Sequence, residues 1–187
     1  MSPRTRTPQR GSSFTSCLLF IVLVIGGGIT YYVKYQQWNG IEKPLANLDY
    51  AHQVTAPQLH EFRKKAVASL CDPAALQLQR VQKVSKSTAG GTKKNEDFEQ
   101  DCIEIKNKLK TIVDDARLRK IPERYKTQYH NALLGAHFGY LSVRALESAC
   151  DADSKAEREA HYKESKNLSA KSYQLLKSSR SFFKNGG

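Results

Sequence analysis

The chain has 187 residues, and 30 Lys and Arg outnumber 18 Asp and Glu to give a net charge of +12. A mean hydropathy of −0.57 and 26% charged residues exclude a protein made mostly of membrane spans, and the length suits one domain of ordinary size. The basic balance is typical of proteins that meet anionic lipid, an anionic polymer, an acidic protein or nucleic acid, without choosing among them.

The N-terminal region predicts a membrane anchor. Residues 1–13 are rich in Pro, Arg, Ser and Thr, which is typical of a disordered basic tail. Residues 17–33 contain no charge, and with their flanks, 14–35, they reach the roughly 20 apolar residues that cross a bilayer as a helix. Aromatic residues from Tyr31 to Trp38 suit the headgroup layer. We therefore expect a single-pass transmembrane signal-anchor helix at 14–35.

Flanking charges predict the orientation of this anchor. Three arginines precede the apolar run and two lysines follow it, so the N-terminus should stay cytoplasmic and the rest of the chain should be extracytoplasmic. A cleaved signal peptide, or a buried helix of a soluble protein, remains an alternative. The small residues at 26–28 also allow a homodimer through the span.

The remaining residues predict an all-α domain. We assign 36–54 to a juxtamembrane connector, with a short helical turn at most, and 55–187 to a soluble helical bundle. No stretch alternates with the period of two that marks an antiparallel sheet. Four helical segments joined by short loops favour an up-down four-helix bundle, with coiled-coil-like apolar spacing.

The four segments are bounded by capping and breaking residues. Thr55 and Pro57 suit the start of the first helix, and Pro73 predicts a kink or break within it. The second helix has an apolar stripe from Phe98 to Ala116, which Ile103 is expected to widen. The third helix runs to about residue 148, and the Gly-x-x-x-Gly spacing of Gly135 and Gly139 within it is interpreted as close helix packing. The fourth helix runs over 155–183 and begins with a capping box.

Three cysteines in the predicted domain leave two alternatives. An exported domain allows a disulfide, and the kink at Pro73 could bring Cys71 and Cys102 together. Ideal bundle register instead favours three free thiols, because it separates Cys71, Cys102 and Cys150 along the bundle axis.

Motifs for catalysis, metal binding and nucleotide binding are absent from the sequence. The phosphate-loop, His-Glu-x-x-His, Glu-x-x-His, Cys-x-x-Cys-His and Gly-x-Ser-x-Gly patterns do not occur, so no cofactor or metal is expected, and an enzyme is the weakest hypothesis. The third helix nevertheless groups polar aromatic residues that could line a small-ligand pocket. These candidates are Tyr125, Tyr129, His130, His137 and Tyr140.

The C-terminal helix is basic and contains no acidic residue from 165 onward. Such a helix suits an anionic lipid surface or wall polymer, and export argues against nucleic acid. Its basic surface candidates are Lys166, Lys171, Lys177, Arg180 and Lys184. The sequence therefore predicts a membrane-anchored, non-catalytic binding, tethering or assembly module with a protein partner in the envelope or membrane. A small-ligand-binding or sensory bundle that uses the third helix is the alternative.

Overall fold

A computed structural model describes residues 45, 47–89 and 96–186. The chain divides into two units, 1–43 and 44–187, and only the second contains described residues. The predicted tail and membrane span therefore lie outside the described residues. Within the described part, no helix is long and apolar enough to cross a membrane.

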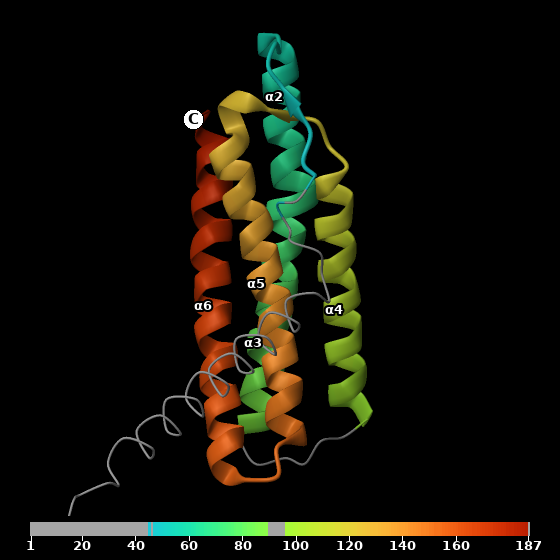
Figure 1. The fold of residues 1–187 in the computed structure, drawn as a ribbon, viewed down its shortest axis with the longest axis vertical. Helices are drawn as coiled ribbons and strands as arrows, with labels where there is room; N and C mark the ends of the chain where they lie inside the picture. Colours follow the sequence, from blue (N-terminus) through green and yellow to red (C-terminus); the bar gives the residue numbers. More distant parts are fainter. Residues whose placement is uncertain (1–44, 46, 90–95, 187) are drawn as a thin grey trace, which may run out of the picture. The chain divides into compact units, whose positions relative to one another are not determined.

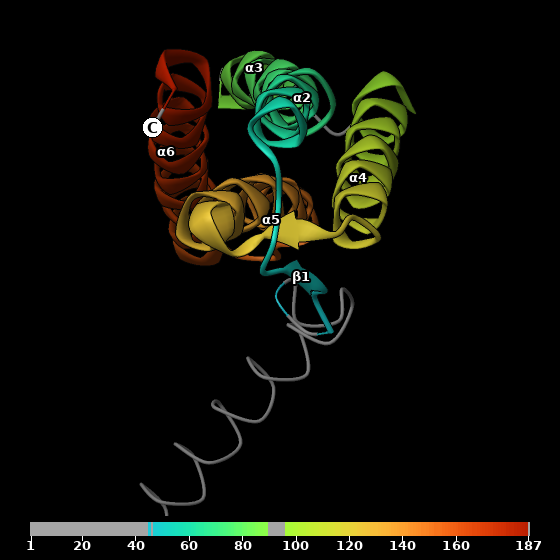
Figure 2. The same cartoon turned by 90° about the horizontal axis from the view of Figure 1, so that it is seen from above.

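The described unit is mostly helical, which confirms the all-α class and the helical bundle. The elements are β1 (Tyr50–Ala51), α2 (Ala56–Ala66), a π-helical turn (Val67–Cys71), α3 (Asp72–Ala89), α4 (Glu96–Arg117), β2 (Ile121–Pro122), a 3-10 turn (Glu123–Tyr125), α5 (Lys126–Asp151) and α6 (Lys155–Asn185). The long helices lie side by side as rods (Figures 1 and 2), and α2 and α3 are joined end to end into the first of the four rods.

The first rod begins at the predicted cap and continues past the proline. Thr55 precedes α2, and its backbone N–H donates to Gln58 Oε1 at 2.9 Å. The rod does not break at Pro73. The five residues 67–71 form a π-helical turn, and α3 follows directly. A wider turn of this kind accommodates a proline because the ring would otherwise clash with the carbonyl one turn earlier.

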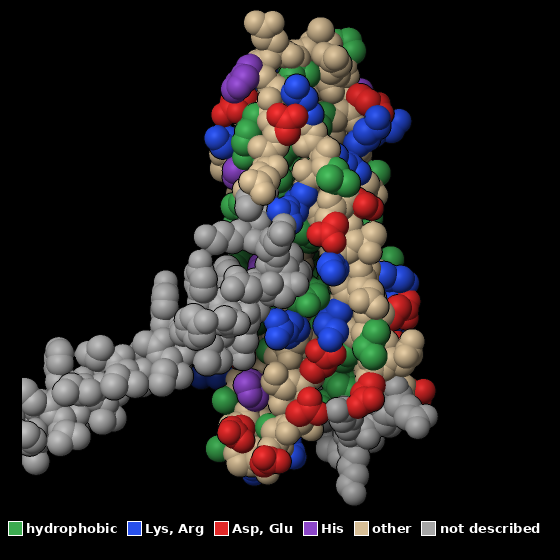
Figure 3. Space-filling view, turned by 45° about the vertical axis from the view of Figure 1, so that its right-hand side comes forward, with side chains coloured by type: hydrophobic (Ala, Val, Ile, Leu, Met, Phe, Trp, Pro, Cys, Tyr) green, Lys and Arg blue, Asp and Glu red, His purple; other side chains and the backbone are tan. Residues whose placement is uncertain are grey.

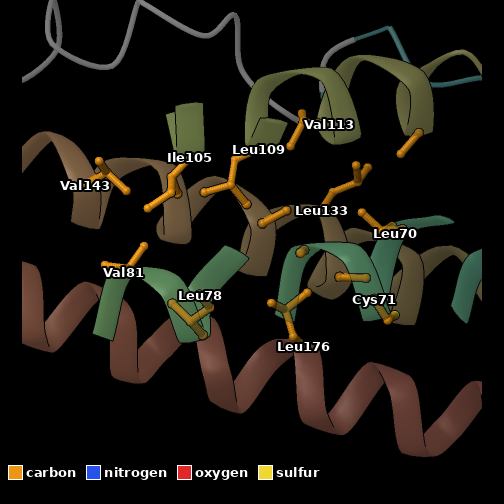
Figure 4. Close-up of a cluster of buried hydrophobic side chains, with 14 of the residues drawn as sticks. Leu70, Cys71, Leu78, Val81, Ile105, Leu109, Val113, Leu133, Val143 and Leu176 are labelled. Carbon is orange, nitrogen blue, oxygen red and sulfur yellow. The ribbon is translucent and has the colours of Figure 1, made fainter. Parts of the chain in front are cut away.

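The bundle core is built from apolar residues of all four rods. Figure 4 shows Leu78, Leu109, Leu133 and Leu176 converging from α3, α4, α5 and α6. All four are at most 2% exposed. Ile103 is an exception to the predicted stripe on α4. It is 46% exposed, because it lies about 100° around the helix from buried Cys102.

The α5–α6 seam is polar and closely packed. Serine hydroxyls of α6 donate to backbone carbonyls of α5, at 2.7 Å from Ser165 to Ser142, 2.7 Å from Ser172 to Gly135 and 3.1 Å from Ser179 to Gln128. Both sides step by seven residues, so one register is kept along the seam. Gly135 is required by this approach, because a Cβ there would lie 2.9 Å from Leu176 Cγ.

A short strand pair fastens the segment before α2 to the bundle. Tyr50 and Ala51 pair in parallel with Ile121 and Pro122, and the Ile121 N–H donates to the Asp49 carbonyl at 2.8 Å. Leu45 and Leu48 are partly buried against the core. The sequence predicts no strand here, because two residues are too few to show a periodic pattern.

Candidate functional site

The two ends of the bundle differ in charge. The basic end consists of residues 47–72, 108–126 and 171–186, with fourteen Lys and Arg and six Asp and Glu. The acidic end consists of residues 73–89, 96–107 and 127–170, with nine Lys and Arg and eleven Asp and Glu. Figure 3 shows acidic side chains gathered at the lower end of one face, around the turn between α5 and α6 and the start of α4.

Ion pairs at the acidic end join neighbouring helices. Arg80 Nη2 lies 3.0 Å from Asp101 Oδ1 and 2.8 Å from Glu104 Oε2, which ties α3 to α4. Lys106 Nζ lies 2.7 Å from Glu147 Oε1, which ties α4 to α5. The hydrogen bond from Arg80 lowers the pKa of the Glu104 carboxyl to about 2. The cations Arg80 and Lys106 are therefore used within the fold.

Along α6, a strip of exposed side chains begins at Lys166 in the acidic end and continues through the basic end. Lys166, Tyr173, Lys177, Arg180 and Lys184 step by seven, four, three and four residues, so they share one face. Tyr173 is 50% exposed, and Lys177 Nζ lies 5.8 Å from the centre of its ring. We call these five residues the α6 strip. It combines cations with an exposed aromatic ring.

The predicted basic residues do not all behave alike. Lys166, Lys177 and Lys184 belong to the α6 strip and are exposed. Arg180 is also on the strip, but its Nε donates to Asp72 Oδ1 of α3, and this hydrogen bond raises the pKa of Arg180. Lys171 lies on another face, with Nζ 6.0 Å from the centre of the Phe138 ring.

Two of the predicted ligand residues use their polar atoms within the fold. Tyr129 is buried, and its hydroxyl donates to the Ala116 carbonyl at 2.9 Å. Burial raises the pKa of Tyr129 to about 12. His130 Nε2 lies 2.7 Å from the Tyr50 hydroxyl, which joins α5 to the segment before α2.

The other three predicted ligand residues are distributed over the 3-10 turn and α5. Tyr125 is buried and stacks on Phe62, His137 is buried in the core, and Tyr140 is partly buried. Burial lowers the pKa of His137 to about 4. A hollow of about 440 Å³ beside the strand pair is lined by Tyr50, Ala51, His52, Gln53, Val54, Gln58, Phe62, Lys120 and Pro122. None of the five predicted residues lines it.

An aromatic cluster that sequence reasoning did not identify fills the core of the basic end. Phe62 lies 5.2 Å from Tyr129 and 6.4 Å from Phe183 between ring centres, and Tyr125 contacts both Phe182 and Phe183 edge to face. The aromatic spacing within α5 and α6 was visible in the sequence. The contribution of Phe62 from α2 depends on the helix arrangement and was not.

The three cysteines Cys71, Cys102 and Cys150 are free thiols in the structure. Cys71 and Cys102 are buried, and burial raises the pKa of each to about 12. The Lys106–Glu147 ion pair sets the register of α4 against α5. One turn further along both helices, Cys102 and Cys150 occupy neighbouring levels, and they interact electrostatically.

Ideal bundle register with a turn between α4 and α5 at residue 121 would separate Cys102 from Cys150 along the bundle axis. The strand and 3-10 turn occupy 121–125, so α5 begins only at Lys126 and its register moves toward Cys150.

Among the described residues, no group of three or more His, Cys, Asp or Glu side chains is arranged to hold a metal ion. The basic end and the α6 strip are the features of the described surface that concentrate positive charge. No protein-family model, curated protein or solved structure matches this chain.

Proposed function

We propose that the chain is a single-pass membrane protein whose helical bundle is a non-catalytic binding and tethering module, with its basic end directed at an anionic membrane surface. The N-terminus would be cytoplasmic and the bundle extracytoplasmic, as the flanking charges of residues 14–35 predict. The observation that carries this proposal is the separation of charge between the two ends of the bundle.

Electrostatics supports one orientation over the other. A Lys or Arg close to an anionic bilayer is attracted by about 1 kcal/mol, and the attraction fades within a Debye length of about 8 Å. Fourteen cations against six acids at the basic end would favour contact, whereas the acidic end would be repelled. Tyr173 adds an exposed ring of the kind that settles at headgroup level.

The connector is long enough to permit this orientation. Fourteen residues lie between Tyr35 and Tyr50, and an extended chain that joins these two residues reaches about 50 Å. Tyr50 belongs to β1, which pairs with β2 at the basic end. The first described strand is therefore attached to the part of the bundle that the proposal directs toward the membrane.

A fluorescent label on the full chain in vesicles tests the proposal. Ser181→Cys places the label beside the α6 strip, and Ser148→Cys places it at the acidic end, each with Cys17 and Cys150 replaced by Ser. Headgroup nitroxides should quench the Ser181→Cys label in vesicles that contain phosphatidylglycerol, but not in phosphatidylcholine alone. High salt should abolish this quenching. Equal quenching of both labels would contradict the proposed orientation.

The small-ligand alternative rests on the Tyr/His face of α5. Tyr129 and His130 already bond to the protein itself, and none of the five candidates lines the hollow beside the strand pair. We therefore favour the tethering function.

A further inference from the structure

A groove crosses the basic end where the π-helical turn meets the end of α6. It has a volume of about 340 Å³ and lies between the first helical rod and the last turn of α6. Gly186 ends α6 in the left-handed conformation, and a Cβ there would lie 2.8 Å from Arg63 Nη1. The lining residues are His60, Arg63, Lys64, Val67, Ala68, Asp72, Phe183 and Lys184.

Cations in this groove lack carboxylate partners. Arg63, Lys64 and Lys184 make no ion pair in the described part of the chain, and Arg63 Nε is buried without a hydrogen-bond acceptor. Among the described residues, the guanidinium of Arg63 has one side-chain hydrogen-bond contact, which is long, at 3.4 Å from Nη2 to His60 Nδ1. A buried donor without an acceptor is costly to leave unsatisfied, so this position suits an anionic ligand.

Asp72 is the one carboxylate among the described residues that line the groove, and it is already engaged. Asp72 Oδ1 accepts a hydrogen bond from Arg180 Nε, so the charge of the Asp72 carboxylate is balanced by the Arg180 guanidinium. Among the described lining residues, the groove therefore presents three cations to a ligand, and its one carboxylate, Asp72, is engaged by Arg180. Arginine and lysine together are a common arrangement for binding phosphate oxygens.

The floor of the groove is apolar. Val67 and Ala68 come from the π-helical turn, and Phe183 comes from α6, where its ring belongs to the aromatic cluster. The π-helical turn shapes this floor because it widens the helix at the level where α6 ends. π-Helical turns occur often at functional sites. Cations above an apolar floor match a molecule with a charged head and an apolar body.

We propose that this groove binds the phosphate headgroup of an anionic amphiphile, with Arg63, Lys64 and Lys184 holding the phosphate oxygens and Val67 and Phe183 contacting the apolar part. The phosphate chemistry stands on the groove alone. The assignment of a membrane lipid as its source rests on the proposed function.

Native mass spectrometry of the full chain in a neutral detergent tests the groove. Phosphatidic acid should bind as a resolved adduct and phosphatidylcholine should not. Lys64→Gln combined with Lys184→Gln should weaken binding about tenfold or more, and Arg63→Gln should do the same, because each removes phosphate contacts. Lys83→Gln combined with Lys86→Gln is the matched control, since it removes two exposed lysines at the acidic end and should leave binding unchanged.

Competition with inorganic phosphate separates the two sources of the ligand. Displacement only at great excess supports a lipid, because the apolar floor then contributes to affinity. Displacement at concentrations equal to those of phosphatidic acid supports a phosphate site with a soluble ligand. Unchanged binding in both groove variants, with unchanged melting temperature, would overturn the site.

Quenching of the Ser181→Cys label in vesicles distinguishes a failure of the groove from a failure of the proposed membrane orientation. Loss of groove binding with intact quenching of the Ser181→Cys label would refute only the groove. Phosphatidic acid binding without quenching of that label would refute only the membrane orientation.

Discussion

The two ends of the bundle use charge differently. At the acidic end, Arg80 and Lys106 pair with carboxylates of neighbouring helices. At the basic end, Arg63, Lys64 and Lys184 surround a groove whose one carboxylate is bonded to Arg180. Paired charges of the first kind hold helices in register. Cations without carboxylate partners contribute nothing comparable inside the fold, and this difference is why we propose the basic end as the surface that meets an anionic partner.

The largest expected effect on stability contrasts the buried aromatic cluster of the basic end with an exposed ring on the same helix. Phe183 is 3% exposed within the aromatic cluster, so Phe183→Ala should destabilise the bundle by about 3–5 kcal/mol. Tyr173→Ala, on the same helix but half exposed, should change stability by less than about 0.5 kcal/mol. Thermal unfolding of the full chain in detergent, followed by circular dichroism, measures both. Equal effects would mean that the cluster does not hold the end of α6.

The second effect is a pH dependence of stability that comes from the burial of His137 and not from the charge of either end. The pKa of His137 is lowered from 6.5 to about 4 because the side chain is buried. Between pH 6.5 and 4, His137 is therefore protonated in the unfolded chain but neutral in the folded chain. The free energy of unfolding should fall as the pH drops from 6.5 toward 4, and His137 should not affect it above pH 6.5.

Melting temperature against pH measures this effect of His137. His137→Leu should flatten the slope between pH 6.5 and 4, whereas His52→Gln, an exposed control, should keep it. A wild-type slope in the His137→Leu variant would contradict this assignment.

A smaller pH effect belongs to the acidic end. Arg80 lowers the pKa of Glu104 from 4.5 to about 2. A lowered carboxyl pKa contributes stability that is complete above pH 4.5 and is lost as the pH falls toward 2. Arg80→Gln should therefore reduce the loss of melting temperature between pH 4.5 and 2, because the ion pair is already absent. Lys86→Gln, which changes an exposed lysine on the same helix, should leave that loss as in the wild type.

The smallest expected effect is a covalent link between two cysteines of the acidic end on oxidation. With glutathione disulfide as oxidant, Cys102 and Cys150 should lose two protons and two electrons to form a disulfide, while the oxidant becomes two glutathione thiols. Peptide mapping without reductant should show the Cys102–Cys150 link in the wild type and in Cys71→Ala. A Cys71–Cys102 link would instead support the alternative expected from sequence and would contradict the register set by Lys106 and Glu147.

Local chemistry made the helices predictable. Ser154 accepts a hydrogen bond from the Glu157 N–H at 3.1 Å, as the capping box predicts, and Gly186 ends α6. The Gly135 spacing correctly indicated a close helix packing, because a Cβ there would meet Leu176. Such signals lie within a few residues of one another, so the sequence contains them in full.

Features that join distant segments were not predictable. The strand pair involves two residues on each side, and the direction of the side chains that line the groove depends on where α2 meets α6. The basic character of α6 was evident in the sequence. Its concentration at one end of the bundle, together with Arg63 and Lys64 from α2, emerges only when the helices are assembled.

Charge reversal at each end is the most direct test of the central claim that the basic end meets an anionic membrane surface. The Ser181→Cys label would be measured in phosphatidylglycerol-containing vesicles with Lys177→Glu and Lys184→Glu together, and separately with Lys83→Glu and Lys86→Glu together. We expect the first pair to abolish headgroup quenching and the second pair to preserve it. Quenching that survives the first pair, or that is lost equally with both, would contradict the account.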